Sequence, residues 1–282
     1  MKSKKIGQCH LCGKIAELTY EHVPPRRAFN EQKVFLHWGR DILGKENFPW
    51  DFFGIKGEQH QNGVGWHTLC EKCNNDTGGW YGKAFIDFTY QGYRKYQELL
   101  NQKKLINRQW ITINFSQIYP LRVIKQIITM FFSINNPDFS RVHSELRALV
   151  LNKEKRGISK ERFDIYSYIL VGSLARYIGI ASILQSKPTG NIIRILSELS
   201  APPFGYVLEI NPKGEDQYCD ISYFANEFRY DQKVNLSLKI PVYECNTYFP
   251  ADYRTKQRVI NDYIKNKLRE LQNKKLAGQR KD

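Results

Sequence analysis

Four cysteines near the N-terminus form two Cys-x-x-Cys pairs. Cys9 and Cys12 make the first pair, and Cys70 and Cys73 make the second. Four thiolates at this spacing can complete the closed tetrahedral shell of a structural zinc ion. Buried thiols, redox pairs or an iron–sulfur centre are the alternatives. The presence of two pairs favours zinc, and the long segment between them must loop out and return.

A carboxylate and an imidazole lie side by side between the two pairs, as Glu21 and His22, and Pro24 and Pro25 follow them closely. Neighbouring side chains on a regular strand point to opposite faces. Glu21 and His22 can therefore act on one atom only if the strand ends or bends there. The prolines, which force an extended exit, make such a break plausible.

The order Cys-x-x-Cys, Glu-His-x-x-Pro and Leu-Cys-x-x-Cys-Asn resembles the HNH endonucleases, also called His-Me finger or ββα-metal enzymes, in their zinc-stapled subgroup. The resemblance covers about residues 7–82. It implies a hairpin and a helix that clasp a catalytic divalent cation, Mg²⁺ or Mn²⁺. It also implies that His22 is the general base that activates water and that Glu21 is a candidate metal ligand. The chemistry agrees, because phosphodiester hydrolysis needs a base and a cation that stabilises developing charge.

Two positions depart from the family's pattern. The usual final His is replaced by Asn74, which is expected to be a ligand or an orienting residue, although an Asn early in a helix can also be a cap. The middle Asn is not obvious from the sequence. Asn62 is the best-placed candidate, with His60 and His67 as competitors.

The remaining candidates each have a simpler structural alternative. His22 could be a strand-end histidine bonded to a backbone carbonyl, and Glu21 could simply pair with a lysine or an arginine. Arg26 and Arg27 follow the Glu-His strand directly and could bind phosphates that flank the scissile bond. Two exposed arginines at a solvated surface are the alternative for that pair.

The charge of the chain favours a polyanionic partner. The sequence contains 43 Lys and Arg against 28 Asp and Glu, a net charge of +15. Residues 1–100 contribute only +3 of this (14 basic, 11 acidic), so the other 182 residues contribute +12. Such an excess attracts nucleic acid, and much of that attraction lies outside the cysteine-rich segment. The terminal basic stretch 265–281 is either a backbone-binding helix or a solvated helix face.

The pattern of apolar residues predicts an α+β fold. We expect a zinc-bound, treble-clef-like HNH module over 1–85, a helical connector over 86–160, and an α+β C-terminal domain of unknown role over 161–282. Helical spacing is predicted near 86–100, from Pro120 to about 134, and near 142–149. Strands are predicted at 163–171, 177–183, 192–196, 206–210 and 234–240, mainly antiparallel, with a basic helix from about Arg254.

We therefore expect a metal-dependent endonuclease that hydrolyses nucleic acid, DNA rather than RNA, in a setting such as restriction or phage defence. The alternative is a zinc-dependent module that binds nucleic acid or protein without cutting. Neither a signal peptide nor a membrane span is apparent, so a cytoplasmic protein with no membrane partner is expected. A homo-oligomer and a partner subunit are both compatible with the sequence.

Overall fold

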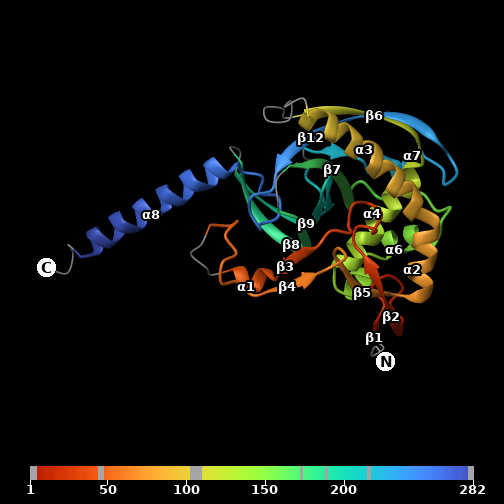
Figure 1. Cartoon of the computed structure of the whole chain (residues 1–282), viewed down its shortest axis with the longest axis horizontal. Helices are drawn as coiled ribbons and strands as arrows, with labels where there is room; N and C mark the ends of the chain where they lie inside the picture. The colour runs from red at the N-terminus through yellow and green to blue at the C-terminus, as the bar shows by residue number, and fades with distance from the viewer. Residues whose placement is uncertain are drawn as a thin grey trace.

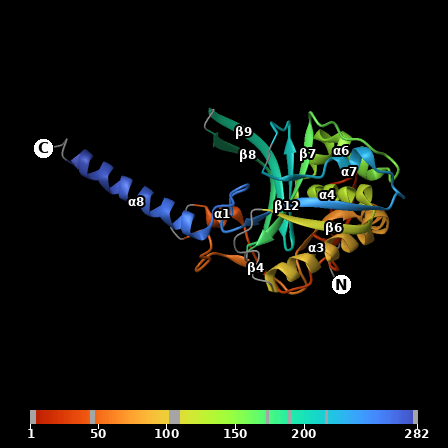
Figure 2. The same ribbon diagram turned by 90° about the horizontal axis from the view of Figure 1, so that it is seen from above.

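The computed structural model describes residues 5–43, 48–101, 110–171, 174–187, 190–214 and 217–278. The chain is α+β and contains one large sheet and two small ones, with helices packed mainly on one side of the large sheet (Figures 1 and 2). One continuous hydrophobic core contains residues from Cys9 to Ile240. The N-terminal cysteine segment therefore shares its core with the later helices and strands.

The N-terminal segment forms a small antiparallel sheet followed by a helix. Its strands have the order β1-β2-β5. Between β2 and β5 the chain leaves the sheet and makes a separate two-stranded hairpin with a short helix. The bounds are β1 Ile6–Gln8, β2 Ile15–His22, β3 Val34–His37, α1 Gly39–Ile42, β4 Gly57–His60, β5 Gly65–Cys70 and α2 Glu71–Thr77. This hairpin insertion is the loop predicted by the long gap between the cysteine pairs.

Helix α2 continues through a wide π-helical turn into the longer helix α3. The π-turn, η1, is Gly78–Gly82, and α3 is Lys83–Asn101. The backbone stays in the right-handed helical region at both junctions, Thr77 and Lys83. Turns of this kind inside helices are frequent at functional sites.

The large sheet has seven strands, in the order β6-β12-β7-β10-β9-β8, with β11 paired to β7. All its pairings are antiparallel except β12 with β7, which is parallel. The strands are β6 Trp110–Ile118, β7 Phe163–Val171, β8 Arg176–Lys187, β9 Gly190–Ala201, β10 Phe204–Ile210, β11 Cys219–Asp220 and β12 Val234–Glu244. The five predicted strand segments match β7, β8, β9, β10 and β12, so the α+β prediction is confirmed.

Strand β6 lies within 86–160, which the sequence was expected to make helical. Burial alternates along it, as expected for a strand with one face on the core. It pairs with β12, whose residues follow more than a hundred positions later. The three-domain division remains a prediction, although the boundary after residue 85 falls inside the first turn of α3.

Helix α4 occupies the centre of the molecule, where it contacts η1, α3, α6, α7, β5, β8 and β9. It begins at Pro120, whose missing N–H is tolerated in the first helical turn. Most of its residues are buried, including polar ones. The helices after α3 are α4 Pro120–Ile134, α5 Asp138–Val142, α6 Ser144–Leu151, α7 Tyr223–Glu227 and α8 Lys256–Gly278. The fold thus places one buried helix between the large sheet and the cysteine segment.

Helix α8 is the expected basic helix, and it projects away from the rest of the chain (Figures 1 and 2). Three apolar side chains along it are exposed by half or more, namely Ile264, Leu268 and Leu271. The last residues of the basic stretch 265–281, namely 279–281, lie outside the described residues.

Candidate metal centre and active-site cleft

The four predicted cysteines come together at the junction of β1, β5 and α2. Their sulfur atoms all lie within 4.8 Å of one another. The Cys12 and Cys70 sulfurs are 3.9 Å apart, close to the roughly 3.8 Å that a tetrahedral zinc ion with 2.3 Å bonds imposes. The cluster could therefore hold a metal ion such as zinc.

The local environment favours the thiolate form of Cys9. The backbone N–H of Cys70 donates to the Cys9 sulfur at 3.3 Å. A hydrogen bond from the Cys73 thiol lowers the pKa of Cys9 to about 4. The same interaction, together with burial, raises the pKa of Cys73 above its ordinary value. The pKa is lowered at Cys9 and raised at Cys12 and Cys73, whose negative charge a bound cation would stabilise.

Glu21 is buried beneath a cleft near the end of β2. Its Oε2 accepts hydrogen bonds from the Ser133 hydroxyl at 2.5 Å and from the Thr68 hydroxyl at 3.4 Å. Burial raises the pKa of Glu21 to about 7, because these two hydroxyls compensate only part of the lost hydration. Within the described residues Glu21 forms no ion pair, so the alternative of a lysine or arginine partner does not apply.

His22 is the last residue of β2, where the strand ends as the prolines predicted. Its Nε2 lies 3.0 Å from the backbone carbonyl oxygen of Asn62. A carbonyl can only accept, so Nε2 carries the proton of the neutral ring and Nδ1 keeps the basic lone pair. The Tyr20 ring packs edge-on at 5.1 Å and fixes the ring further. The carbonyl bond foreseen as the structural alternative is thus present, and it also suits a general base.

Asn62, proposed as the middle Asn, meets His22 through its backbone carbonyl. Its competitors lie elsewhere: His60 is 3.9 Å from Glu58, and the His67 ring packs against Tyr20 at 5.4 Å. None of Asn62, His60 and His67 lines the cleft that contains His22, and it is Asn62 whose carbonyl is bonded to the His22 ring. The structure therefore brings Asn62, and not the two histidines, to His22.

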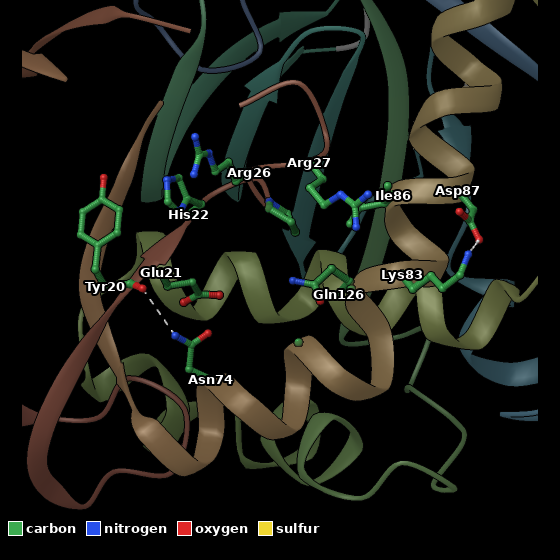
Figure 3. Close-up of a pocket in the computed structure, with 13 residues that line it drawn as sticks. Tyr20, Glu21, His22, Arg26, Arg27, Asn74, Lys83, Ile86, Asp87 and Gln126 are labelled. Atoms are coloured by element: carbon green, nitrogen blue, oxygen red, sulfur yellow. Dashed lines mark hydrogen bonds and ion pairs between the residues drawn. The ribbon is translucent and has the colours of Figure 1, made fainter. Parts of the chain in front are cut away.

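Asn74 lies in the body of α2, and Cys70 is the residue at the N-cap. Its amide nitrogen donates to the Thr19 hydroxyl at 3.0 Å and to the Tyr20 carbonyl at 3.5 Å. Helix capping is therefore not its role. Figure 3 shows its amide oxygen turned to the side of the cleft where the Glu21 carboxylate lies.

Glu21, His22 and Asn74 line one cleft of about 580 Å³ between β2, α2, η1, α3 and α4 (Figure 3). Arg26 and Arg27 lie at its rim, are exposed, and have no acidic partner among the described residues. The full lining is Tyr20, Glu21, His22, Pro25, Arg26, Arg27, Asn74, Gly78, Gly82, Lys83, Ile86, Asp87 and Gln126. The cleft thus combines an imidazole, two side chains with oxygen atoms that could bind a metal ion, and two arginines without acidic partners.

Sequence reasoning missed Asn30, which fixes the two loops beside His22. Its Oδ1 accepts from the Val64 N–H at 2.7 Å, and its Nδ2 donates to the carbonyls of Pro24 and Val64 at 2.6 and 2.7 Å. Gly63 has a φ of +82°, and a Cβ there would lie 2.0 Å from the Asn30 carbonyl oxygen. The Asn-Gly pair at 62–63 was a visible turn signal, whereas nothing near Asn30 in the sequence indicated its contacts.

Sequence reasoning also missed the contribution of α4. Ser133 binds the Glu21 carboxylate and Gln126 lines the cleft, although both follow the cysteine segment by more than forty residues. Their apolar neighbours predict only a buried helix. Polar residues on the buried face of an otherwise apolar helix were the available signal, because such groups need a partner.

Comparison of the chain with protein-family models, with curated proteins and with solved structures finds no match. Among the helices that the structure describes, none is long and apolar enough to pass through a bilayer.

Proposed function

We propose that this protein is an HNH-type, metal-dependent endonuclease that hydrolyses phosphodiester bonds of nucleic acid, DNA in preference to RNA. One observation carries the proposal. His22, with its tautomer set by a carbonyl, lines the same cleft as two oxygen donors and two unpaired arginines. A non-catalytic binding module has no need of an oriented imidazole beside a buried carboxylate.

The chain's own residues can divide the work of hydrolysis between them. The free Nδ1 of His22 would take a proton from the attacking water. Arg26 and Arg27 would hold the phosphates next to the scissile bond, as exposed cations without carboxylate partners can. The net charge of +15 would draw the polyanion toward the protein.

Glu21 and Asn74 fit a hard divalent cation such as Mg²⁺ or Mn²⁺. The Oε1 of Glu21 has no hydrogen-bond partner among the described residues, and the Asn74 amide oxygen is turned to the same space (Figure 3). Oxygen donors of these types are the ones such cations prefer. When bound, the cation would stabilise the charge that develops on the phosphate and on the leaving oxygen.

We further infer that the four-cysteine cluster binds zinc as a structural ion. All four ligands are thiols, which leaves no open position for water. Cys9 and Cys73 are buried in the common core, so the ion would join the turn after β1 to the start of α2. That junction positions Asn74, the residue directly after Cys73.

The test is cleavage of plasmid DNA and of RNA by the purified protein with Mg²⁺ or Mn²⁺. His22→Ala should lower the cleavage rate about a hundredfold or more, as expected for a lost general base. His37→Ala is the matched control. His37 is also bonded to a carbonyl, that of Lys56 at 3.1 Å, but it does not line the cleft.

Three outcomes decide the matter. Cleavage lost in His22→Ala and kept in His37→Ala supports the nuclease. Equal cleavage by all three proteins places the activity elsewhere or in a contaminant. Intact substrate with every metal, while binding is retained, supports the second candidate.

The second candidate is a zinc-dependent module that binds nucleic acid or protein without cutting. Asn74 stands in place of the family's last histidine, which weakens the metal shell. Among the described residues, the four cysteines are also the only group of three or more His, Cys, Asp or Glu side chains that could share an ion.

A further inference from the structure

Two glycines of the π-turn η1 contribute bare backbone to the wall of the cleft, next to the side chains of Lys83, Ile86 and Asp87. Gly78 and Gly82 of the π-turn η1 line the cleft, and Gly79 lies between them without lining it. None of the three has a positive φ, so alanine would fit the backbone at each position. Glycine in a helix costs about 1 kcal/mol relative to alanine. Neither backbone conformation nor helix stability explains why this part of the wall lacks side chains.

Gly82 shows where the missing side chain would go. The residue is buried, yet a Cβ added to it would meet no heavy atom within 4 Å apart from its chain neighbours and the backbone of its own helix. A buried position that faces open space is facing a cavity, and the cavity here is the cleft. A side chain at Gly82 would therefore occupy space that a ligand could use.

Gln126 of α4 supplies a second and independent sign of a ligand. Its side chain is only 3% exposed, lines the cleft, and makes no hydrogen bond among the described residues. Figure 3 shows its amide nitrogen pointing across the cleft, toward Glu21 and Asn74. The buried Oε1 atom has no partner, and Nε2, which faces the cleft, is free to donate to a bound polar group.

We propose that Gly78, Gly82 and Gln126 form a subsite for the nucleotide that flanks the scissile bond, and this rests on the proposed nuclease function. The sugar–phosphate backbone of the strand lies against the bare turn, at a distance that a side chain would prevent. The Nε2 of Gln126 donates a hydrogen bond to a phosphate oxygen or a sugar oxygen of that nucleotide. Arg26 and Arg27, at the rim, bind the continuing backbone.

A nucleic-acid strand fits this subsite better than a small metabolite does. The bare wall is a helical turn with no charged group of its own, and Lys83 beside it is paired with Asp87 at 2.6 Å. Such a wall provides close contact without a strong binding group. A flexible polymer held elsewhere by arginines can use that contact, because its charge is already neutralised at the rim.

The first experiment measures binding of a short fluorescein-labelled DNA duplex by anisotropy, in the His22→Ala background with Mg²⁺ present. Gly82→Leu should weaken binding about tenfold or more, as expected when a close contact is blocked. Gly79→Leu is the matched control, because it adds the same bulk to the same turn outside the cleft. Thermal unfolding of both variants checks that the turn is intact.

The second experiment uses the active protein with Gln126→Met, which keeps the volume of the side chain and removes its polar atoms. The value of KM should rise about fivefold or more while kcat stays within about twofold. A fall in kcat without a change in KM would place Gln126 on the reacting atoms and overturn the subsite.

The outcomes distinguish the subsite from the nuclease function on which it rests. If the parent protein neither binds nor cleaves nucleic acid, the nuclease proposal and the subsite fall together. If the parent protein binds and cleaves nucleic acid, and Gly82→Leu and Gly79→Leu bind equally well, the subsite is refuted and the nuclease proposal stands. Weaker binding in Gly82→Leu alone, at unchanged thermal stability, supports the subsite.

Discussion

Replacing Glu21 by glutamine tests whether the buried carboxylate beneath the cleft is destabilising when charged and binds a cation. Burial raises the pKa of Glu21 from the ordinary 4.5 to about 7. The folded state therefore holds the proton more tightly than the unfolded state does. The stability that the folded protein gains by holding this proton on Glu21 is complete below pH 4.5 and is lost as pH rises through 7. The gap between the two pKa values corresponds to about 3 kcal/mol of unfolding free energy.

Glu21→Gln should therefore unfold at higher urea than the parent protein near pH 8. Its unfolding free energy should exceed the parent's by up to about 3 kcal/mol at that pH, and by less than half of that near pH 5.5. Zinc is kept in excess throughout. The amide replaces the carboxylate with a neutral group of the same shape that can still accept the Ser133 hydrogen bond. Glu31→Gln, at an exposed position, should leave the pH profile unchanged.

Mg²⁺ provides the second part of this test. A cation that binds only the folded protein raises its stability, so millimolar Mg²⁺ should stabilise the parent near pH 8 and leave Glu21→Gln unaffected. Parallel pH profiles of the two proteins would show that Glu21 is not desolvated in the folded state. Equal responses to Mg²⁺ would remove Glu21 from the proposed metal site.

Three further results are expected. Cys73→Ser should lose the bound zinc and unfold the β2–β5–α2 region, seen by metal analysis and proteolysis, whereas Cys219→Ser should keep its zinc. Asn30→Ala should lower the unfolding free energy by about 3 kcal/mol, because it leaves buried backbone groups unpaired; an unchanged urea midpoint would contradict this. Asn62→Ala should cleave DNA at the parent's rate, since only its carbonyl meets His22, and a large loss would implicate its side chain.

Short-range patterns in the sequence predicted much of the fold. The predicted strand 163–171, which is dense in β-branched and aromatic residues, has the same bounds as β7. Helix α4 begins at Pro120, as predicted. These elements can be predicted from local sequence alone, through the strand propensity of their residues and the geometry of proline. Strand β6 was missed although Ile111, Ile113 and Phe115 alternate with polar residues, which is the local pattern of a strand with one buried face. What the sequence does not show is its partner, because β12 lies far along the chain.

The candidate site divides in the same way. The cysteine cluster and the end of β2 at His22 followed from spacing and from the two prolines. Ser133 and Gln126 could not be foreseen, because their roles depend on how α4 packs against β5 and η1. A polar residue on an apolar helix signals that a partner exists, but only the tertiary fold says which one.

The position of α4 limits how this protein can be divided. The hydroxyl that holds Glu21 comes from a helix that is itself buried by the large sheet and by α6 and α7. A fragment that stops after α2 would keep all four cysteines and lose the far wall of the cleft. The candidate site of this chain is therefore not confined to the cysteine segment, and transferring it to another protein would require the central helix and the elements that bury it as well.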